Sequence, residues 1–136
     1  FEANIGGVWR SAQSFEAAMI FTVGLRKYRK QATDTGNTPA HVPFLRFASI
    51  DDLVEHLPAS CSLVGVELDE HAVDLPNFTH PERACYLLGA EDNGIPDDIL
   101  HRCHKVVRIP GGRYCLNVAS AASIVMYDRT VKMNGG

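Results

Sequence analysis

Short apolar runs alternate along the chain with amphipathic segments, and turn-forming residues separate them. Four of the runs favour buried strands because their apolar residues are continuous or alternate over the length of a strand. They span residues 18–23, 61–68, 84–88 and 105–109. Strands that alternate with helical segments are typical of α/β folds. The pattern therefore predicts an α/β fold with a mostly parallel sheet flanked by helices.

Helices are expected where apolar residues recur at helical spacing behind a capping residue. Asn4 is a suitable N-cap for a first helix, and Ser49 for a second helix that stops at Pro58. Pro96 fits the first turn of a short helix, where a missing N–H is harmless. The predicted helices span residues 6–15, 49–57, a short stretch from residue 95, and 116–132, with polar loops at 26–41 and 69–81.

The last predicted helix, residues 116–132, is rich in alanine and other small or apolar residues. We expect it to be buried on more than one face. Two interpretations are open. Such a helix in a small chain packs against a second subunit, or it is an ordinary core helix.

Length and composition describe one globular domain. The chain has 136 residues, of which 46% are hydrophobic and 21% charged, which excludes disordered and fibrous classes. No apolar run approaches the roughly 18 residues of a membrane span, so no membrane association is expected. The chain begins at Phe1 without methionine or a leader, and we expect it to be a trimmed piece of a longer product.

The cysteines and histidines give no metal-binding pattern. Cys61, Cys85, Cys103 and Cys115 form no C-x-x-C pair, and we interpret them as buried thiols in a reducing cytoplasm. His101, Cys103 and His104 lie close together in sequence but match no common zinc spacing, so a solvated helix end is expected there and no metal site.

Positive charge is concentrated in two segments although the net charge is -3. The first holds Arg26, Lys27, Arg29 and Lys30 around Tyr28, and the second, residues 99–127, contains four Lys or Arg and no acid. Such segregation suits a localised site for anions, such as a phosphate backbone. A pair of solvated faces explains the same pattern.

Three glycine-containing segments stand where open α/β sheets place their ligands, at strand ends or helix starts. Residues 4–12 read N-x-G-x-x-x-R-x-A, residues 88–95 read L-G-x-E-x-x-G-I, and Ile109-Pro110 is followed by L-N-V at 116–118, before the alanine-rich helix. In this order and spacing the segments resemble the three motifs of the SpoU (TrmH-like) family of RNA ribose methyltransferases, within the SPOUT superfamily. The resemblance runs through nearly the whole chain.

The resemblance implies a SPOUT-type fold whose C-terminal segment passes through a loop as a trefoil knot. Residues 1–136 would form one SpoU-type methyltransferase domain that lacks the family's first strand ahead of Asn4. The implied reaction transfers a methyl group from S-adenosylmethionine, bound at the knot, to a ribose 2′-hydroxyl of tRNA or rRNA. The implied assembly is a homodimer, built on residues 119–126 and the first helix, and the implied location is the cytoplasm.

Carried over motif by motif, the resemblance implies roles for individual residues. The catalytic set would be Asn4, Arg10, Glu91 and Asn117. Contacts to S-adenosylmethionine would come from Val66, Glu67, Leu88, Gly89, Glu91, Ile109, Leu116, Asn117 and Val118, mostly through their backbones. Independently of the motifs, the basic cluster predicts an RNA-binding set of Arg26, Lys27, Tyr28, Arg29 and Lys30, with Tyr28 either stacking on an unpaired base or packing against its own loop.

The chemistry suits these residue types. Methyl transfer from a sulfonium needs in-line placement rather than a covalent nucleophile, and the ribose hydroxyl must lose its proton as the bond forms. Arg10 would either lie near that proton or bind the phosphate beside the target ribose in bidentate fashion. A guanidinium is normally charged at neutral pH, which makes the first role difficult.

Two residues depart from the family pattern, in which the third motif usually reads S-L-N-V-S. Cys115 and Ala119 stand in place of the two serines, so a catalytically weakened RNA-binding relative is the alternative function. A nicotinamide or flavin enzyme is disfavoured because no G-x-G-x-x-G follows a strand. Taken singly, each motif residue also has a structural explanation: Arg10 as a surface charge, Glu91 and Asn93 as turn formers, and Asn117 as a helix cap.

Overall fold

A computed structural model describes residues 17–24, 43–89, 94–111 and 117–135. The chain divides into two compact units, residues 1–57 and residues 58–136, which we describe one at a time. The helix expected at 6–15 and the loop expected at 26–41 lie outside the described residues.

The first unit contains two parallel strands and one helix. Strand β1 (Ile20–Val23) pairs with β2 (Phe44–Phe47), with Ile20 opposite Phe44 and Val23 opposite Phe47. The strand expected at 18–23 is confirmed, whereas β2 was not predicted. Phe47 is buried and its ring meets that of Phe21 edge-on, with 5.9 Å between the ring centroids.

Helix α3 (Ile50–His56) follows β2 and has the N-cap that the sequence predicts. The Ser49 side chain accepts a hydrogen bond from the backbone N–H of Asp52, and the Asp52 carboxylate accepts one from the N–H of Ala48. This reciprocal arrangement satisfies two N–H groups at the start of the helix. Leu53 is buried on its inner face.

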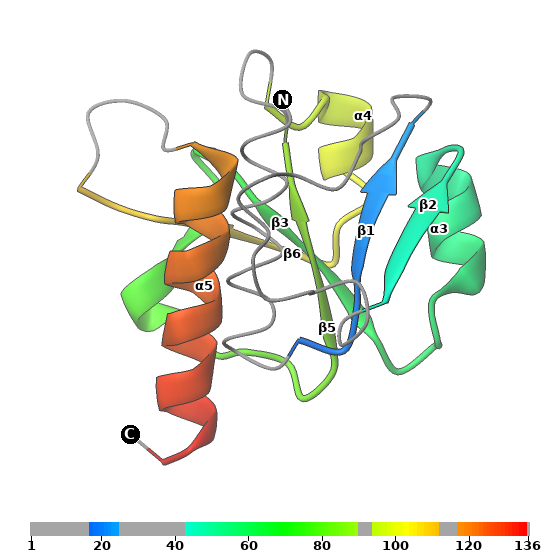
Figure 1. The fold of residues 1–136 in the computed structure, drawn as a ribbon. Coiled ribbons are helices and arrows are strands. Elements are labelled where there is room, and N and C mark those ends of the chain that lie inside the picture. Colours follow the sequence, from blue (N-terminus) through cyan, green and yellow to red (C-terminus); the bar gives the residue numbers. More distant parts are fainter. Residues whose placement is uncertain (1–16, 25–42, 90–93, 112–116, 136) are drawn as a thin grey trace. The chain divides into compact units, whose positions relative to one another are not determined.

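The second unit is built on a parallel sheet of four strands in the order β4-β6-β3-β5 (Figure 1). The strands are β3 (Ser62–Val66), β4 (Val73–Asp74), β5 (Ala84–Leu88) and β6 (Lys105–Arg108), and the helices are α4 (Asp97–Leu100) and α5 (Val118–Met133). The strands predicted at 61–68, 84–88 and 105–109 are confirmed with ends trimmed by at most two residues. The mostly parallel α/β architecture is thereby confirmed.

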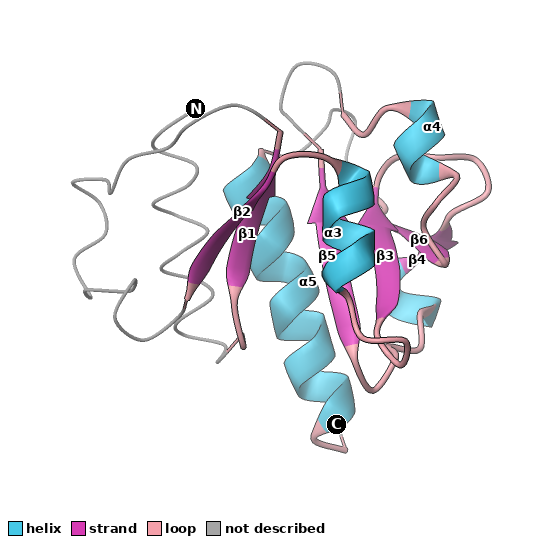
Figure 2. Cartoon of the chain, turned by 90° about the vertical axis from the view of Figure 1, so that its right-hand side faces the viewer, coloured by secondary structure: helices cyan, strands magenta, loops and turns pink. Residues whose placement is uncertain are grey.

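Different groups cover the two faces of this sheet. On one face, Val64 and Val107 are fully buried and form a core cluster with Leu75, Phe78 and Val125 of α5. Figure 2 shows α5 lying behind the strands. On the other face, a Cβ at Gly65 would lie 3.1 Å from Leu100 of α4. Helical segments therefore flank the sheet, as expected.

Residues 69–81 were expected to be a polar loop, and that prediction is wrong. The segment contains β4 and a 3₁₀ helix, Leu75–Asn77, and it buries Leu75, Phe78 and His80. Strand β4 has only two residues, which pair with β6 as Val73 with Val107 and Asp74 with Arg108. So short a strand leaves no periodic signal, because its formation depends on a partner about 34 residues away.

Helix α5 is buried at three residues, and most of its other residues are half-buried. Ala121, Ala122 and Val125 are buried. An opposite stripe of larger side chains is exposed: Ile124, Tyr127 and Val131. The core interpretation holds for the buried face, and packing against a second subunit stays a prediction.

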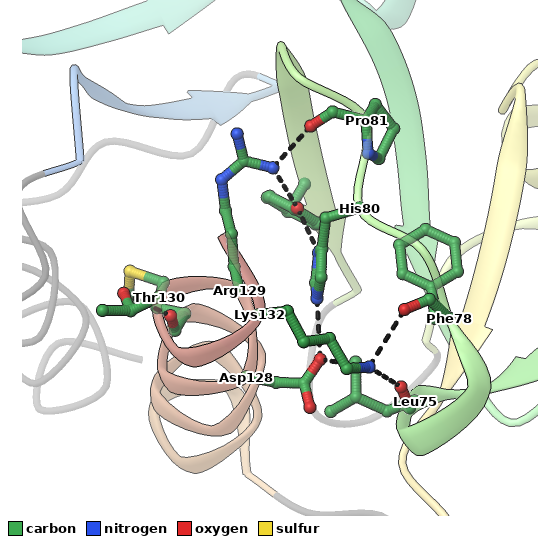
Figure 3. Close-up of polar contacts among 10 residues, drawn as sticks. Leu75, Phe78, His80, Pro81, Asp128, Arg129, Thr130 and Lys132 are labelled. Carbon is green, nitrogen blue, oxygen red and sulfur yellow. Dashed lines mark hydrogen bonds and ion pairs between the residues drawn. The ribbon is translucent and has the colours of Figure 1, made fainter. Parts of the chain in front are cut away.

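A polar network fastens the last turns of α5 to the segment between β4 and β5 (Figure 3). The fully buried His80 side chain lies 2.7 Å from the Tyr86 hydroxyl through Nδ1 and 2.7 Å from an Asp128 carboxylate oxygen through Nε2. Lys132 pairs with Asp128 and donates to the carbonyls of Leu75 and Phe78. The network joins side chains 48 positions apart in sequence.

The partners of His80 determine which of its ring nitrogens carries the proton. A carboxylate accepts, so Nε2 of His80 donates to Asp128; Nδ1 of the neutral ring then accepts from the Tyr86 hydroxyl. Arg129 donates to the same hydroxyl at 3.0 Å and to the carbonyls of Pro81 and Glu82 at 2.7 Å. Burial lowers the pKa of His80 from its ordinary 6.5, which outweighs the opposing effect of Asp128.

The lowered pKa makes stability depend on pH. Below about pH 6.5 the unfolded chain takes up a proton at His80 more readily than the folded chain, so the free energy of unfolding decreases as the pH falls. Denaturant unfolding at about pH 7.5 and 5.5 should show that the free energy of unfolding decreases more for the parent protein than for His80→Gln as the pH falls. His71→Gln is the control because the His71 side chain is 85% exposed. Equal pH dependence in His80→Gln and the parent would contradict this assignment.

The three described cysteines are free thiols. Cys85 is buried, as predicted, and its burial raises the pKa of the thiol to about 12. Cys61 and Cys103 are only half-buried, and Cys115 lies outside the described residues. The described helices include none with the length and apolarity to cross a bilayer.

Candidate active site

The carboxyl ends of three parallel strands lie next to one another in the second unit. Val66, the last residue of β3, pairs with Leu88, the last residue of β5, on one side and with Val107 of β6 on the other. Gly89 and Ile109 follow directly after β5 and β6. We call Val66, Leu88, Gly89 and Ile109 the strand-end edge. All four are half-buried, which leaves them accessible at the edge where open α/β sheets hold ligands.

Helix α5 begins at the same end of this unit as β5 ends (Figure 1). Asn117 is its N-cap, and its side-chain oxygen accepts a hydrogen bond from the N–H of Ser120 at 2.8 Å. The structural explanation of Asn117 as a helix cap is therefore confirmed. The side chain is exposed, and its amide NH₂ group, which the cap does not use, is a donor at the start of the helix.

Gly89 packs directly against the peptide that joins Gly94 to Ile95. A Cβ at Gly89 would collide with the Gly94 carbonyl carbon and lie 2.5 Å from the Ile95 nitrogen. Gly94 itself has a φ of +65°, in the left-handed region that favours glycine. Both glycines of the L-G-x-E-x-x-G-I segment are thus required for the backbone after β5 to return to the strand-end edge.

The carboxylate of Glu67, the first residue after β3, binds this returning backbone. Its Oε2 accepts from the N–H of Ile95 at 2.8 Å, and its Oε1 accepts from the N–H of Leu68 at 2.9 Å. The backbone N–H of Glu67 donates to the carbonyl of Val107 at 3.1 Å. Sequence reasoning predicted that the backbone of Glu67 contacts the cofactor, but it did not predict this side-chain contact. An acid directly after a buried strand was the only available signal.

Two positive side chains of the second basic segment, residues 99–127, have partners within the second unit. The Arg108 guanidinium forms an ion pair with Asp74 at 2.7 Å and donates to the Asp69 carbonyl at 3.1 Å. The Lys105 ammonium lies 5.8 Å from the centre of the Phe78 ring. Asp74 belongs to β4, which the sequence did not predict. An acid-free run in sequence is therefore not acid-free in space.

His104 has a structural role that sequence reasoning also missed. The ring Nδ1 of His104 accepts from the backbone N–H of Leu63 at 2.9 Å, and the backbone N–H of His104 donates to the Leu63 carbonyl at 2.8 Å. His101 and His104 are exposed and Cys103 is half-buried, as a solvated helix end would be. Within the described ranges, no three His, Cys, Asp or Glu side chains are grouped as metal ligands.

Several predicted site residues lie outside the described part of the chain: Asn4, Arg10, Arg26, Lys27, Tyr28, Arg29, Lys30, Glu91 and Leu116. The structure does bring together Val66, Glu67, Leu88, Gly89 and Ile109, which come from three separate segments. Asn117 and Val118 start α5 at the same end of the unit. The geometry is that of a ligand site at the carboxyl edge of a parallel sheet.

Comparison with protein families decides the identity of this fold. The family model described as "SpoU rRNA Methylase family" matches residues 1–127, which is nearly the whole chain and includes all three motif segments. The chain belongs to the SpoU rRNA methylase family. The resemblance drawn from the motifs is thereby confirmed.

Two relatives illustrate the similarity of this SpoU chain to known enzymes. The 23S rRNA (guanosine-2′-O-)-methyltransferase RlmB of Acinetobacter baylyi is 29% identical over 134 residues, covering 92% of this chain and 53% of that protein. The tRNA (guanosine(18)-2′-O)-methyltransferase of Escherichia coli is 25% identical over 130 residues, covering 92% of this chain and 56% of that protein. The SpoU chain thus spans about half the length of these relatives.

A solved structure supports the SpoU fold. The SpoU methyltransferase AviRb from Streptomyces viridochromogenes, in complex with the cofactor AdoMet, matches with a TM-score of 0.82 at 23% identity. The match covers 98% of this chain and 54% of that one. At this level of identity the likeness establishes the shared α/β architecture.

Proposed function

We propose that this SpoU domain transfers a methyl group from S-adenosylmethionine to a ribose 2′-hydroxyl of tRNA or rRNA. The observation that carries the proposal is the strand-end edge, where the second motif and the start of the third converge beside Val66 and Glu67. Membership of the family and the names of its relatives support the reaction. The proposal treats residues 1–136 as a single cytoplasmic SpoU-type domain whose C-terminal segment forms a trefoil knot.

The described residues fit such a cofactor. Val66, Leu88 and Ile109 offer apolar, half-buried side chains for an adenine ring. The ends of the parallel strands offer backbone N–H and C=O groups for its polar edge. When bound, the cofactor supplies an electrophilic methyl group on a sulfonium. The remaining cofactor contacts in the proposal are those of Glu67, Gly89, Glu91, Leu116, Asn117 and Val118.

The chain's own residues would position the target hydroxyl. In the proposal Arg10 binds the phosphate beside the target ribose or lies next to the departing proton, and Asn4 supports it as the polar partner in the first motif. Glu91 and Asn117 complete the catalytic set. In-line placement of the hydroxyl, rather than covalent catalysis, supplies much of the rate.

The basic segment around Tyr28 is proposed to hold the RNA. Each phosphate that a Lys or Arg neutralises releases counterions, so replacing Arg26 and Lys27 with glutamine should weaken RNA binding across sequences and flatten its salt dependence by about two contacts' worth. Affinity for S-adenosylmethionine should stay unchanged in the same variant. The measurement is RNA affinity at several salt concentrations. An unaltered salt slope would mean that these charges are solvated and do not bind the RNA.

A homodimer completes the proposal. The exposed stripe of Ile124, Tyr127 and Val131 on α5 supports an interface there, because large apolar side chains in register on one helix face are typical of subunit contacts. Together with the first helix, such an interface would bring Arg10 of one subunit near the cofactor of the other.

A second candidate, a catalytically weakened RNA-binding relative, is favoured by the departures at Cys115 and Ala119. A thiol is a weaker hydrogen-bond donor than a serine hydroxyl. Ala119 lies in the first turn of α5, where its carbonyl accepts from the Ser123 hydroxyl at 2.9 Å, and its methyl side chain cannot donate to a ligand.

Two measurements test the function. Titration calorimetry with S-adenosylmethionine, using NADH as the control ligand, asks whether the site takes the expected cofactor. Single-turnover transfer of a labelled methyl group to total tRNA or rRNA, followed by mass mapping of ribose methylation, asks whether the reaction occurs. Binding without transfer would favour the weakened relative, and no binding would overturn the proposal.

A further inference from the structure

We propose that Glu67 is a positioning residue whose carboxylate sets the backbone of the second motif, so that the strand-end edge has the shape that binds S-adenosylmethionine. The inference rests on the proposed function and adds a role for a side chain to which the motifs assign only a backbone contact. Glu67 acts through the peptide between Gly94 and Ile95, which we call the Gly94–Ile95 peptide.

The Glu67 carboxylate is held in one place by two backbone hydrogen bonds. Each of its two oxygens accepts one backbone N–H, that of Ile95 at 2.8 Å and that of Leu68 at 2.9 Å. Ile95 is 28 residues from Glu67 in sequence, so the side chain joins the end of β3 to the backbone that follows β5. A carboxylate with two backbone donors is held in one orientation, and hydrogen bonds to a charged acceptor are stronger than neutral ones.

Gly94 leaves the space that this contact needs. A Cβ at Gly94 would lie 2.5 Å from Oε2 of Glu67. The absence of a side chain at Gly94 is therefore what lets the carboxylate reach the Ile95 N–H. Its φ of +65° turns the backbone in the same place. The L-G-x-E-x-x-G-I segment and Glu67 fit each other at this point.

The side chain of Ile95 is held independently of Glu67. The side chain is buried, and its Cδ1 would lie 3.6 Å from a Cβ placed at Gly65. Cys103 and Leu100 cover the same part of β3. The apolar contact keeps Ile95 on the sheet when Glu67 is removed. The carboxylate is therefore expected to control the direction of the Gly94–Ile95 peptide rather than the folding of the unit.

The Gly94–Ile95 peptide in turn lies against Gly89 of the strand-end edge. The contact is so close that a Cβ at Gly89 would meet this peptide. Leu88, one residue earlier, pairs with Val66. A shift of the peptide would therefore be transmitted to Gly89 and Leu88, which belong to the proposed cofactor contacts.

The experiment compares Glu67→Ala and Glu67→Gln with a matched control, Glu70→Ala, in the full chain. Glu70 follows the same strand, and its side chain is 85% exposed and pairs with the equally exposed His71. Alanine removes both acceptors at position 67. Glutamine keeps one carbonyl oxygen, which can accept from Ile95, and it removes the charge.

The first readout is hydrogen exchange at the Ile95 amide without cofactor. Glu67→Ala should exchange this amide about tenfold faster or more, because a partly buried N–H loses its acceptor. Glu67→Gln should lie between alanine and the parent, and Glu70→Ala should match the parent. Unchanged exchange in Glu67→Ala would overturn the proposal.

The second readout is the affinity for S-adenosylmethionine, with KM and kcat measured alongside. Glu67→Ala should bind the cofactor about tenfold more weakly, with a raised KM for the cofactor, little change in kcat at saturation and an unchanged KM for RNA. Glutamine should restore most of the affinity. If glutamine is as impaired as alanine while its Ile95 amide stays protected, Glu67 contacts the cofactor by its charge, and the positioning role is wrong.

The outcomes separate this proposal from the proposed function. Failure of the parent protein to bind S-adenosylmethionine would refute the function, and exchange at Ile95 would still test the positioning role. Parent-like cofactor affinity in Glu67→Ala would refute the positioning role alone. Should Glu67→Ala fail to fold, Gly94→Ala tests the same contact from the other side: it must raise Ile95 exchange and weaken cofactor binding, and parent-like values would overturn the proposal.

Discussion

Replacing Gly89 with alanine is expected to remove measurable binding of S-adenosylmethionine and to lower the stability of the second unit. The added Cβ would collide with the Gly94 carbonyl carbon and lie 2.5 Å from the Ile95 nitrogen. Both atoms belong to the backbone, so no side chain can rotate away. Overpacking of this kind costs about 1–3 kcal/mol, and relief would come from displacing the Gly94–Ile95 peptide from the strand-end edge. Calorimetric affinity and denaturant unfolding measure the two effects.

Gly24→Ala is the matched control for Gly89→Ala. Gly24 has a φ of +113°, and among the described residues no atom beyond its chain neighbours lies within 4 Å of a Cβ built there. Alanine at that position introduces backbone strain of about 1–3 kcal/mol without a collision with a described residue. Cofactor affinity should therefore survive in Gly24→Ala. Cofactor binding by Gly89→Ala as tight as that of the parent would show that the backbone after β5 does not shape the site.

Replacing Arg10 with alanine is expected to slow methyl transfer by about 10²–10⁴-fold in single turnover. The reason is chemical, because in the proposed function Arg10 contacts the target ribose or its neighbouring phosphate and not the adenosine. Affinity for S-adenosylmethionine and the free energy of unfolding should stay close to those of the parent. Single-turnover rates, calorimetry and denaturant unfolding measure the three quantities. Parallel losses of cofactor affinity and activity would contradict the assignment.

Arg10→Lys distinguishes the two roles left open for this side chain. Lysine keeps the positive charge but cannot form the planar, bidentate contact to a phosphate. If Arg10 binds the phosphate beside the target ribose, lysine should recover part of the rate and raise the KM for RNA. If Arg10 lies next to the departing proton, lysine should instead shift the pH dependence of the single-turnover rate.

Strands β3, β5 and β6 of the second unit could be predicted from sequence because each contains an apolar run, as expected for a sheet covered on both faces. Strand β2 could not be predicted, because the exposed Arg46 interrupts its four residues and its pairing with β1 brings together segments that lie far apart in sequence. Strand β4 was missed for a related reason. Its two residues become a strand only through their contact with β6.

The candidate site was also predicted only in part. Its backbone positions could be predicted, because ligands of α/β sheets lie where parallel strands end. Its side-chain contacts could not. The hydrogen bond that the Ile95 N–H donates to Glu67 joins residues 28 positions apart, and the ion pair between Asp74 and Arg108 joins residues 34 positions apart. No local pattern encodes them, since each depends on how the strands are ordered in the sheet.

The packing of α5 on the sheet also affects how the second unit folds while the chain is being synthesised. Every strand of the second unit precedes α5 in sequence, so the ribosome releases the sheet before the helix that covers one of its faces. Until then Val64 and Val107 lack Val125, and the buried His80 lacks Asp128. The nascent sheet therefore presents an open apolar face during translation, and the unit completes its core only when the last turns of α5 have emerged.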